Sequence, residues 1–251
     1  MLLFMLDSLR LTIADLSALG FFLVAWIVHS MAVRGRWIRR VSLTTAMNVQ
    51  REAWMRTMAQ RDLRMIDTSI MVGLQQGTAF FASSSLIAVG GCFALLGASD
   101  HVLTVLGDLP LSGPPSRPLF EIKVLGLITI LVFAFFKFGW SYRLFNYCSI
   151  LIGAVPMLRE GLHSPEMEAA VHRATRMNVL AGRHFNAGLQ AIFFSLGYLG
   201  WFVNPSVFVA TTIILLAVLV RRQFFSAARM AVLETAQAGP GNGEAILPES
   251  Q

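Results

Sequence analysis

The sequence has few charged residues and almost no cysteine. Only 14% of its 251 residues are Asp, Glu, Lys or Arg, whereas about a quarter is usual for soluble domains. Together with the positive mean hydropathy, this shortage excludes a disordered chain, a coiled coil and almost any water-soluble globule. The two cysteines, Cys92 and Cys148, are too few for a secreted scaffold that depends on disulfides. We interpret both as small apolar packing residues.

Sequence patterns of catalysis are absent as well. The chain has no phosphate-binding loop, no His-Glu-x-x-His, no Cys-x-x-Cys and no nucleophile elbow. Glu168 and His172 stand four residues apart and can share a helix face, as metal ligands do, but such a pair is usually a solvated contact. His163 and His184 do not complete a set of ligands. We therefore predict no metal and no cofactor, and we rank an enzyme acting on lipid behind non-enzymatic functions.

Long apolar stretches dominate the chain, in which 55% of the residues are hydrophobic. A helix needs about 20 mostly apolar residues to cross a bilayer, and helices are required because lipid offers no partner to backbone polar groups. Asp15 does not suit a signal peptide, so we expect the first stretch to be retained. The sequence predicts an all-α bundle with five transmembrane spans, at about 13–33, 69–96, 122–154, 185–203 and 206–220.

Asn204-Pro205 separates the last two stretches. Proline lacks a backbone N–H and biases the residue before it away from helical conformation, so the dipeptide favours a tight turn between two antiparallel helices. The alternative is one long kinked helix through the same point. We prefer the hairpin, because about 36 apolar residues are too many for a single crossing.

Arginine is concentrated in alternate connections between the predicted spans. The positive-inside rule places such connections in the cytoplasm, so five spans give an outside N-terminus and a cytoplasmic C-terminus. The segment 98–119, rich in Gly and Pro, is then an irregular external loop. The arginines of the cytoplasmic connections are Arg34, Arg36, Arg39, Arg40, Arg51, Arg56, Arg61, Arg64, Arg159, Arg173, Arg176, Arg183, Arg221, Arg222 and Arg229.

The formal net charge of +6 is a consequence of the same distribution. A strongly basic chain can indicate nucleic-acid binding, but here membrane topology accounts for the charges, so we expect no nucleic-acid partner. We expect the arginine-rich cytoplasmic face to attract the anionic headgroups of membrane lipids.

The segment 41–66 has the pattern of an amphipathic helix. Met47, Trp54 and Met58 recur on one narrow stripe at helical spacing. The helix can lie on the cytoplasmic membrane surface, or it can continue into span two and pack against the third cytoplasmic helix. We favour the continuous helix, because no Pro or Gly interrupts 42–72.

Two further segments lie outside the predicted spans. Pro165, preceded by Ser164 as a cap, starts a cytoplasmic helix that continues to Arg183, with Gly182 as a possible break. Residues 237–251 contain Gly-Pro-Gly and scattered acids and predict a disordered tail. The remainder, 1–236, is a single transmembrane helical domain.

Polar residues at membrane depth are costly and therefore suggest a binding site. With the orientation above, those of this chain gather toward the cytoplasmic half, where they can line an inward-facing basic cavity for an anionic group. The alternative is structural, because a lysine near the boundary can extend to water and amides can join helices. The candidate ligand-binding residues are Lys137, Arg143, Asn146, Gln75, Asn186 and Gln190.

One run of residues resembles a known family. Phe138-Gly139-Trp140-Ser141-Tyr142-Arg143, followed by Asn146-Tyr147, is similar to the central signature of the membrane-protein family called domain of unknown function 599. Phe185-Asn186-x-Gly188 and Arg221-Arg222 fit the family too, whereas Gln223 stands where it commonly has an acidic residue. The family occurs in bacteria and plants. The resemblance implies a multi-span topology and no established activity.

We therefore expect an integral membrane protein, in the inner membrane of a bacterium, with a non-enzymatic structural or accessory role. Such a role implies a membrane-protein partner or a homo-oligomer. The alternative is a small transporter or a lipid- or anion-binding protein that uses the cytoplasm-facing cavity.

Overall fold

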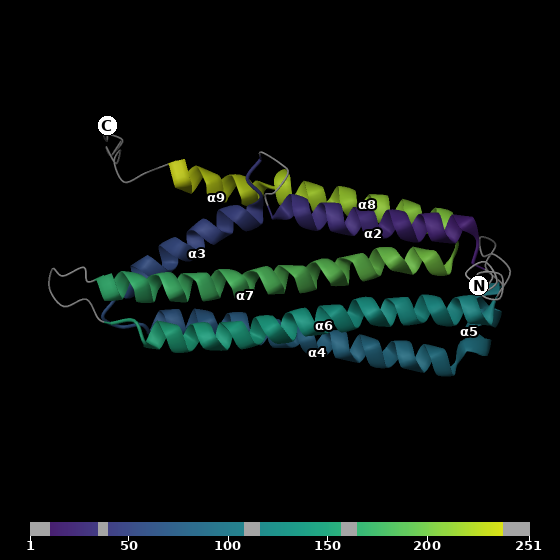
Figure 1. The fold of residues 1–251 in the computed structure, drawn as a ribbon, viewed down its shortest axis with the longest axis horizontal. Coiled ribbons are helices and arrows are strands. Elements are labelled where there is room, and N and C mark those ends of the chain that lie inside the picture. Colours follow the sequence, from purple (N-terminus) through teal and green to yellow (C-terminus); the bar gives the residue numbers. More distant parts are fainter. Residues whose placement is uncertain (1–10, 35–39, 108–115, 157–164, 238–251) are drawn as a thin grey trace, which may run out of the picture.

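The computed structural model describes residues 11–34, 40–107, 116–156 and 165–237. This part of the chain is helical and contains no strand, which confirms the all-α prediction (Figure 1). Its elements are α2 (Ile13–Val33), α3 (Leu43–Ala59), α4 (Met65–Gly97), α5 (Ser99–Gly107), α6 (Arg117–Gly153), α7 (Pro165–Tyr198), the 3₁₀ helix η1 (Leu199–Phe202), α8 (Pro205–Phe224) and α9 (Ala227–Gln237).

Helices α2, α4, α6, α7 and α8 lie along the long axis of the molecule (Figure 1), and α4, α6 and α7 are much longer than α2 and α8. Helices α4, α6 and α7 have 33, 37 and 34 residues, whereas α2 and α8 have 21 and 20. At 1.5 Å per residue, the short helices are about 30 Å long, which matches the hydrocarbon core of a bilayer, and the long ones about 50–55 Å. The long helices therefore extend roughly 20 Å past the short ones, and α3 packs on that projecting end.

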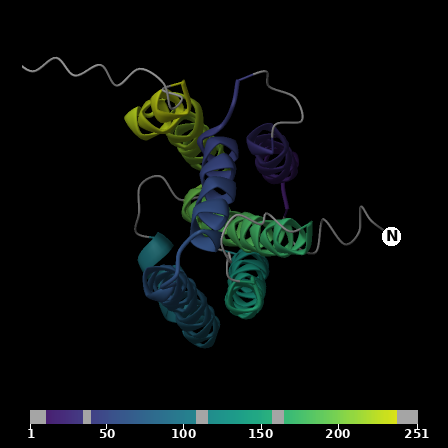
Figure 2. The same cartoon turned by 90° about the vertical axis from the view of Figure 1, so that its left-hand side faces the viewer.

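Side-chain contacts show that α6 and α7 are antiparallel. The Ser141 hydroxyl of α6 donates to the Ala181 carbonyl of α7 at 2.8 Å. Toward the other end, Lys123 Nζ of α6 donates to the Trp201 carbonyl at 2.7 Å. Figure 2 shows α7 in the middle, with α2, α8 and α9 on one side and α4 and α6 on the other.

The buried apolar residues form two separate cores along this axis. The first lies at the level of α2 and α8 and is rich in aromatic rings, with Phe22 against Phe194 at 5.4 Å and Trp201 stacked on Phe208 at 5.4 Å. The second lies where only the long helices and α3 are present, and contains Met55 of α3. We call the segments around this second core the extension: α3, the start of α4, the end of α6 and the start of α7.

The prediction of one continuous helix over 42–72 is wrong. Helix α3 ends at Ala59 and α4 begins at Met65, although no Gly or Pro lies between them. Asp67, which is fully buried, accepts hydrogen bonds from Trp54 Nε1 and Arg61 Nη1, both at 2.7 Å. These contacts hold the turn between α3 and α4, so a buried carboxylate rather than a helix-breaking residue makes the turn.

Arg64 fixes this turn to the end of α6. Its Nη1 donates to the carbonyls of Ile152 and Val155 at 3.1 and 2.6 Å, and its Nη2 donates to the carbonyl of Pro156 at 3.0 Å. Ile152 lies in the last turn of α6, and Val155 and Pro156 follow just after the helix. The guanidinium thus sits at a helix C-terminus, where positive charge is favourable.

The substitution Arg64→Gln is therefore expected to loosen the extension. Glutamine cannot reach three carbonyls, and the loss of charged hydrogen bonds corresponds to roughly 2–3 kcal/mol of folding free energy. Arg56→Gln is the control, because Arg56 is exposed and its guanidinium pairs with Glu52 one turn away on the same helix. Limited proteolysis should cut the Arg64→Gln variant within α3 faster than wild type and leave Arg56→Gln unchanged. Equal cutting of both variants would refute the role of Arg64.

Other boundaries also differ from the sequence predictions. Helix α5 and the start of α6 occupy parts of 98–119, so this segment is not wholly irregular. The stretch 185–203 is not a separate helix, because α7 continues without a break from Pro165 to Tyr198. The turn at Asn204-Pro205 is present, and the Asn204 side chain caps α8 by accepting from the Val207 N–H at 2.7 Å. The predicted tail beyond Gln237 lies outside the described residues.

Candidate functional site

The amides among the predicted ligand-binding residues join neighbouring helices. Gln75 Nε2 of α4 donates to Ser149 Oγ of α6 at 3.1 Å. Gln190 Nε2 of α7 donates to Ser30 Oγ of α2 at 2.8 Å and lies 2.9 Å from His29 Nδ1. These two amides thus bond to different partner helices and do not face one cavity.

The remaining four predicted residues lie at or near the surface. Lys137 Nζ is 5.1 Å from the centre of the Phe133 ring. Arg143 is exposed and its Nε donates to the Tyr147 hydroxyl at 2.6 Å. Asn146 is exposed and Asn186 is half-buried. The structure does not gather the six predicted residues into one site, and whether any of them binds a ligand stays a prediction.

Sequence reasoning missed a buried polar cluster at the opposite end of the bundle. Asp15 and Lys123 are 3% and 8% exposed. Trp201 connects them, because its Nε1 donates to Asp15 Oδ1 at 2.7 Å and its carbonyl accepts from Lys123 Nζ at 2.7 Å. The three residues come from α2, α6 and η1, so only the fold brings them together. The signal in the sequence is a single charged residue at the edge of an apolar run, which does not indicate its partners.

A second missed cluster ties α3 to α7 within the extension. The Arg51 guanidinium donates to Asn178 Oδ1, and Asn178 Nδ2 lies 3.7 Å from Cys148 Sγ. Gly182 makes room for this arrangement, because a Cβ there would lie 2.9 Å from Arg51 Cζ. Gly182 is thus a contact site and not a helix break. Burial lowers the pKa of the Arg51 guanidinium from its usual value.

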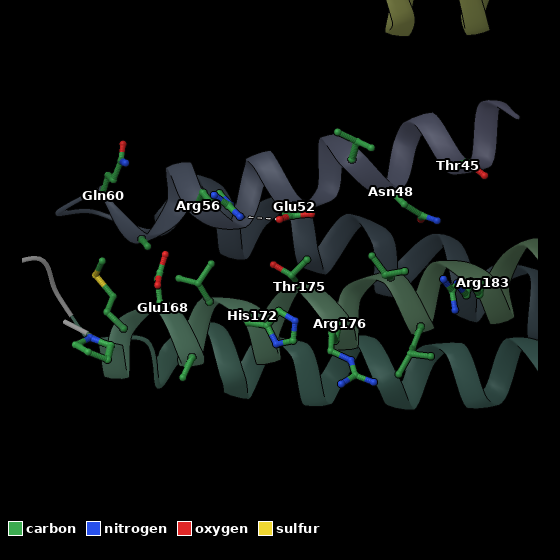
Figure 3. Close-up of a pocket in the computed structure, with 18 residues that line it drawn as sticks. Thr45, Asn48, Glu52, Arg56, Gln60, Glu168, His172, Thr175, Arg176 and Arg183 are labelled. Carbon is green, nitrogen blue, oxygen red and sulfur yellow. Dashed lines mark hydrogen bonds and ion pairs between the residues drawn. The ribbon is translucent and has the colours of Figure 1, made fainter. Parts of the chain in front are cut away.

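A half-open groove of about 1020 Å³ lies between α3 and α7. Figure 3 shows α3 diverging from α7, so that the groove is wide at Thr45 and Arg183 and narrow at Gln60 and Glu168. Its polar lining comes from both helices: Thr45, Asn48, Glu52, Arg56, Gln60, Glu168, His172, Thr175, Arg176 and Arg183. None of the six predicted ligand-binding residues is among those that line it.

One side chain of the groove has an unsatisfied polar atom. Thr175 is 8% exposed, and its Oγ1 has no hydrogen-bond partner among the described residues. In Figure 3 this side chain lies between the ribbons of α3 and α7, beside the ion pair of Arg56 with Glu52. Buried hydroxyls are rarely left unpaired, so the Thr175 hydroxyl is the unusual feature of the groove.

The charged lining of the groove consists of three arginines, Arg56, Arg176 and Arg183, and two glutamates, Glu52 and Glu168. Within the described part of the chain, no cluster of three or more His, Cys, Asp or Glu residues can hold a metal ion. Glu168 and His172, the pair considered as metal ligands from their spacing, both line the groove.

The architecture is that of an integral membrane protein. Four helices of the described chain are long and apolar enough to cross a membrane: Ile13–Val33, Met65–Gly97, Arg117–Gly153 and the segment Pro205–Leu233. Helix α7 is not among them, because Arg183, Asn186 and Gln190 interrupt even its more apolar second half.

The chain belongs to the family described as protein of unknown function, DUF599, whose model matches residues 17–228. This confirms the resemblance inferred from the run of residues around Trp140. No curated protein and no solved structure has significant similarity to the chain.

Proposed function

We propose that the protein is a non-enzymatic accessory component of the membrane, with five spans that anchor a packed cytoplasmic extension. The observation that carries this proposal is the division of the buried residues into two cores, only one of which lies at the level of the two bilayer-length helices. The extension includes α3 and the start of α7, whose polar composition does not suit lipid. It therefore presents a rigid helical surface, with its groove, to the cytoplasm.

The end of α7 is proposed as the fifth span although it is less apolar than the other four. Its residues Ala191, Phe194 and Tyr198 are buried in the first core. Its polar Gln190 bonds to α2. A central helix that contacts protein on most sides need not be as apolar as one that faces lipid, because its polar groups have protein partners.

Contacts between α3 and the end of the chain support an odd number of spans. Gln223 Nε2 of α8 donates to Thr44 Oγ1 of α3 at 2.7 Å, and Arg229 Nε of α9 donates to the Val41 carbonyl at 2.7 Å. These segments must lie on the same side of the membrane. Four crossings separate them if α7 spans, which returns the chain to that side, whereas three would place them on opposite sides.

The arginine distribution supports a cytoplasmic location for this side. Arg34 follows α2, and Arg221 and Arg222 lie in the last turn of α8. Arg222 extends over the Phe193 ring, with its Cζ 5.4 Å from the ring centre. By the positive-inside rule, the extension and the C-terminus then face the cytoplasm and the N-terminus faces outside.

Labelling of single cysteines with a membrane-impermeant maleimide tests this topology. His101→Cys in α5 should react in intact spheroplasts, whereas Arg176→Cys in α7 and Ala228→Cys in α9 should react only after lysis. All three positions are exposed, and the two native cysteines are buried and should give little background. Reaction of Ala228→Cys from outside, with Arg176→Cys still protected, would mean that α7 does not cross.

A further inference from the structure

We infer that the groove between α3 and α7 binds the phosphate group of an anionic membrane lipid. This inference rests on the proposed function, because it requires the wide end of the groove to lie at the cytoplasmic membrane surface. Figure 1 places the start of α3 beside the ends of α2 and α8, and Figure 3 shows that the groove widens in that direction. A lipid headgroup can therefore enter the groove from the bilayer side.

The Thr175 hydroxyl is the first argument for a ligand. Threonines inside helices usually bond to the carbonyl four residues earlier, and Thr57, Thr78 and Thr129 do so in this structure at 3.0, 2.7 and 2.9 Å. Thr175 makes no such bond although it is buried. Its hydroxyl is available to a group inside the groove, and a phosphate oxygen is a strong acceptor for it.

Charge is the second argument. Arg56 is paired with Glu52 at 2.8 Å. Arg176 and Arg183 line the same groove, are exposed, and have no carboxylate partner within 4.0 Å among the described residues. Both are long side chains that can turn onto an anion, and arginine matches phosphate through paired N–H groups. Asn48, at the wide end, adds a neutral donor.

The apolar residues of the wide end favour a lipid over a soluble phosphate compound. Val49 of α3 and Val179 and Leu180 of α7 line the groove beside Arg183. Phospholipids combine an anionic phosphate with adjoining apolar chains, and this lining offers both surfaces within a few residues. A helix of a partner protein would instead need an apolar strip along the whole groove, but Gln60, Glu168 and the pair of Arg56 with Glu52 occupy its narrow half.

Native mass spectrometry of the full chain from nanodiscs tests the proposal. The discs contain phosphatidylcholine alone or with phosphatidylglycerol, and the variants are Thr175→Val and the double substitution Arg176→Gln/Arg183→Gln. The matched control is Arg173→Gln/Arg221→Gln, which removes the same charge from exposed positions that do not line the groove.

We expect wild type and the control to retain phosphatidylglycerol in preference to phosphatidylcholine. The double substitution Arg176→Gln/Arg183→Gln should weaken this retention about tenfold, and Thr175→Val about threefold, because each variant loses contacts to the phosphate. Thr175→Val should not lower the unfolding temperature, since valine has a similar shape and removes an unpaired hydroxyl. A loss of lipid with unchanged stability separates binding from folding.

Several results would overturn the inference. Equal loss of lipid in the control pair would mean unspecific attraction to a basic surface. Full retention of phosphatidylglycerol by Thr175→Val would mean that the Thr175 hydroxyl does not contact the lipid. Displacement of the lipid by millimolar glycerol 3-phosphate would assign the groove to a soluble phosphate, and a protein helix seated in it would exclude a lipid. If the cysteine labelling still reports the proposed topology, only the ligand is wrong, whereas external labelling of Arg176→Cys refutes both proposals.

Discussion

Gly188→Ala is expected to destabilise the protein strongly, whereas Gly139→Ala is not. A Cβ at Gly188 of α7 would lie 2.7–2.9 Å from three ring atoms of Phe138 of α6. The Phe138 ring cannot move aside, because it is fully buried and packs between Phe81 and Phe185 at centroid distances of 5.5 and 5.7 Å. Overpacking of this kind costs about 1–3 kcal/mol.

Gly139 provides the matched control on α6. It is exposed, and a Cβ there would meet no atom within 4 Å. Alanine is also the better helix former. Thermal unfolding in one detergent should therefore show a lowered midpoint for Gly188→Ala only. Similar midpoints for both variants would contradict the close approach of α6 and α7.

Lys123→Met is expected to have the largest effect of any single charge removal. The substitution leaves the Trp201 carbonyl without its donor and the buried Asp15 carboxylate without the nearby positive charge. Removing one member of a buried charged cluster typically costs about 3–5 kcal/mol, because the other charge stays buried and uncompensated. Asp15→Asn should be damaging for the same reason.

The double variant Asp15→Asn/Lys123→Met separates coupling from simple loss of packing. Its destabilisation should be smaller than the sum of the two single effects, since neither charge is then left alone. Arg117→Gln is the control, because Arg117 lies at the exposed start of α6 and pairs with Asp100 and Glu121 near the surface. It should leave the unfolding midpoint unchanged. Strict additivity of the single effects would show that Asp15 and Lys123 act independently.

Helix positions were largely predictable from local sequence. Helix α2 has the bounds expected from its apolar run, because Thr12 and Asp15 form a capping box before it. Helix α8 begins where Asn204 caps and Pro205 fits the first turn. The starts of both helices depend on residues within four positions of the boundary, so the local sequence is sufficient to predict them.

Other boundaries depend on distant contacts and could not be predicted in this way. The break between α3 and α4 follows from hydrogen bonds to Asp67 and from Arg64 on the end of α6. The length of α7 was underestimated because its polar residues interrupt the apolar pattern. In the fold, several of these residues are buried or form hydrogen bonds to other helices. A window of hydropathy cannot distinguish a polar residue that faces protein from one that ends a span.

The groove was missed for a related reason. The polar residues inside the apolar stretches include Gln75 and Gln190, but the fold uses these amides to join helices. The groove is built from two polar, amphipathic segments, α3 and the start of α7. Their relative position is set by the turn at 60–64 and by the close packing of the Arg51 side chain against Gly182. Thr175 has no distinguishing neighbour in the sequence, and only the missing hydrogen bond in the fold identifies it.

The central claim is that α4, α6 and α7 leave the bilayer and continue as a water-exposed extension. Spin labels on the exposed face of α6 test it in proteoliposomes, two at Phe133 and Phe136 and two at Tyr147 and Ile150. The first pair should collide mainly with oxygen, which concentrates in lipid, and the second mainly with a water-soluble nickel chelate. Oxygen-dominated collisions at Ile150, equal to those at Phe136, would place the second core inside the membrane and contradict the account.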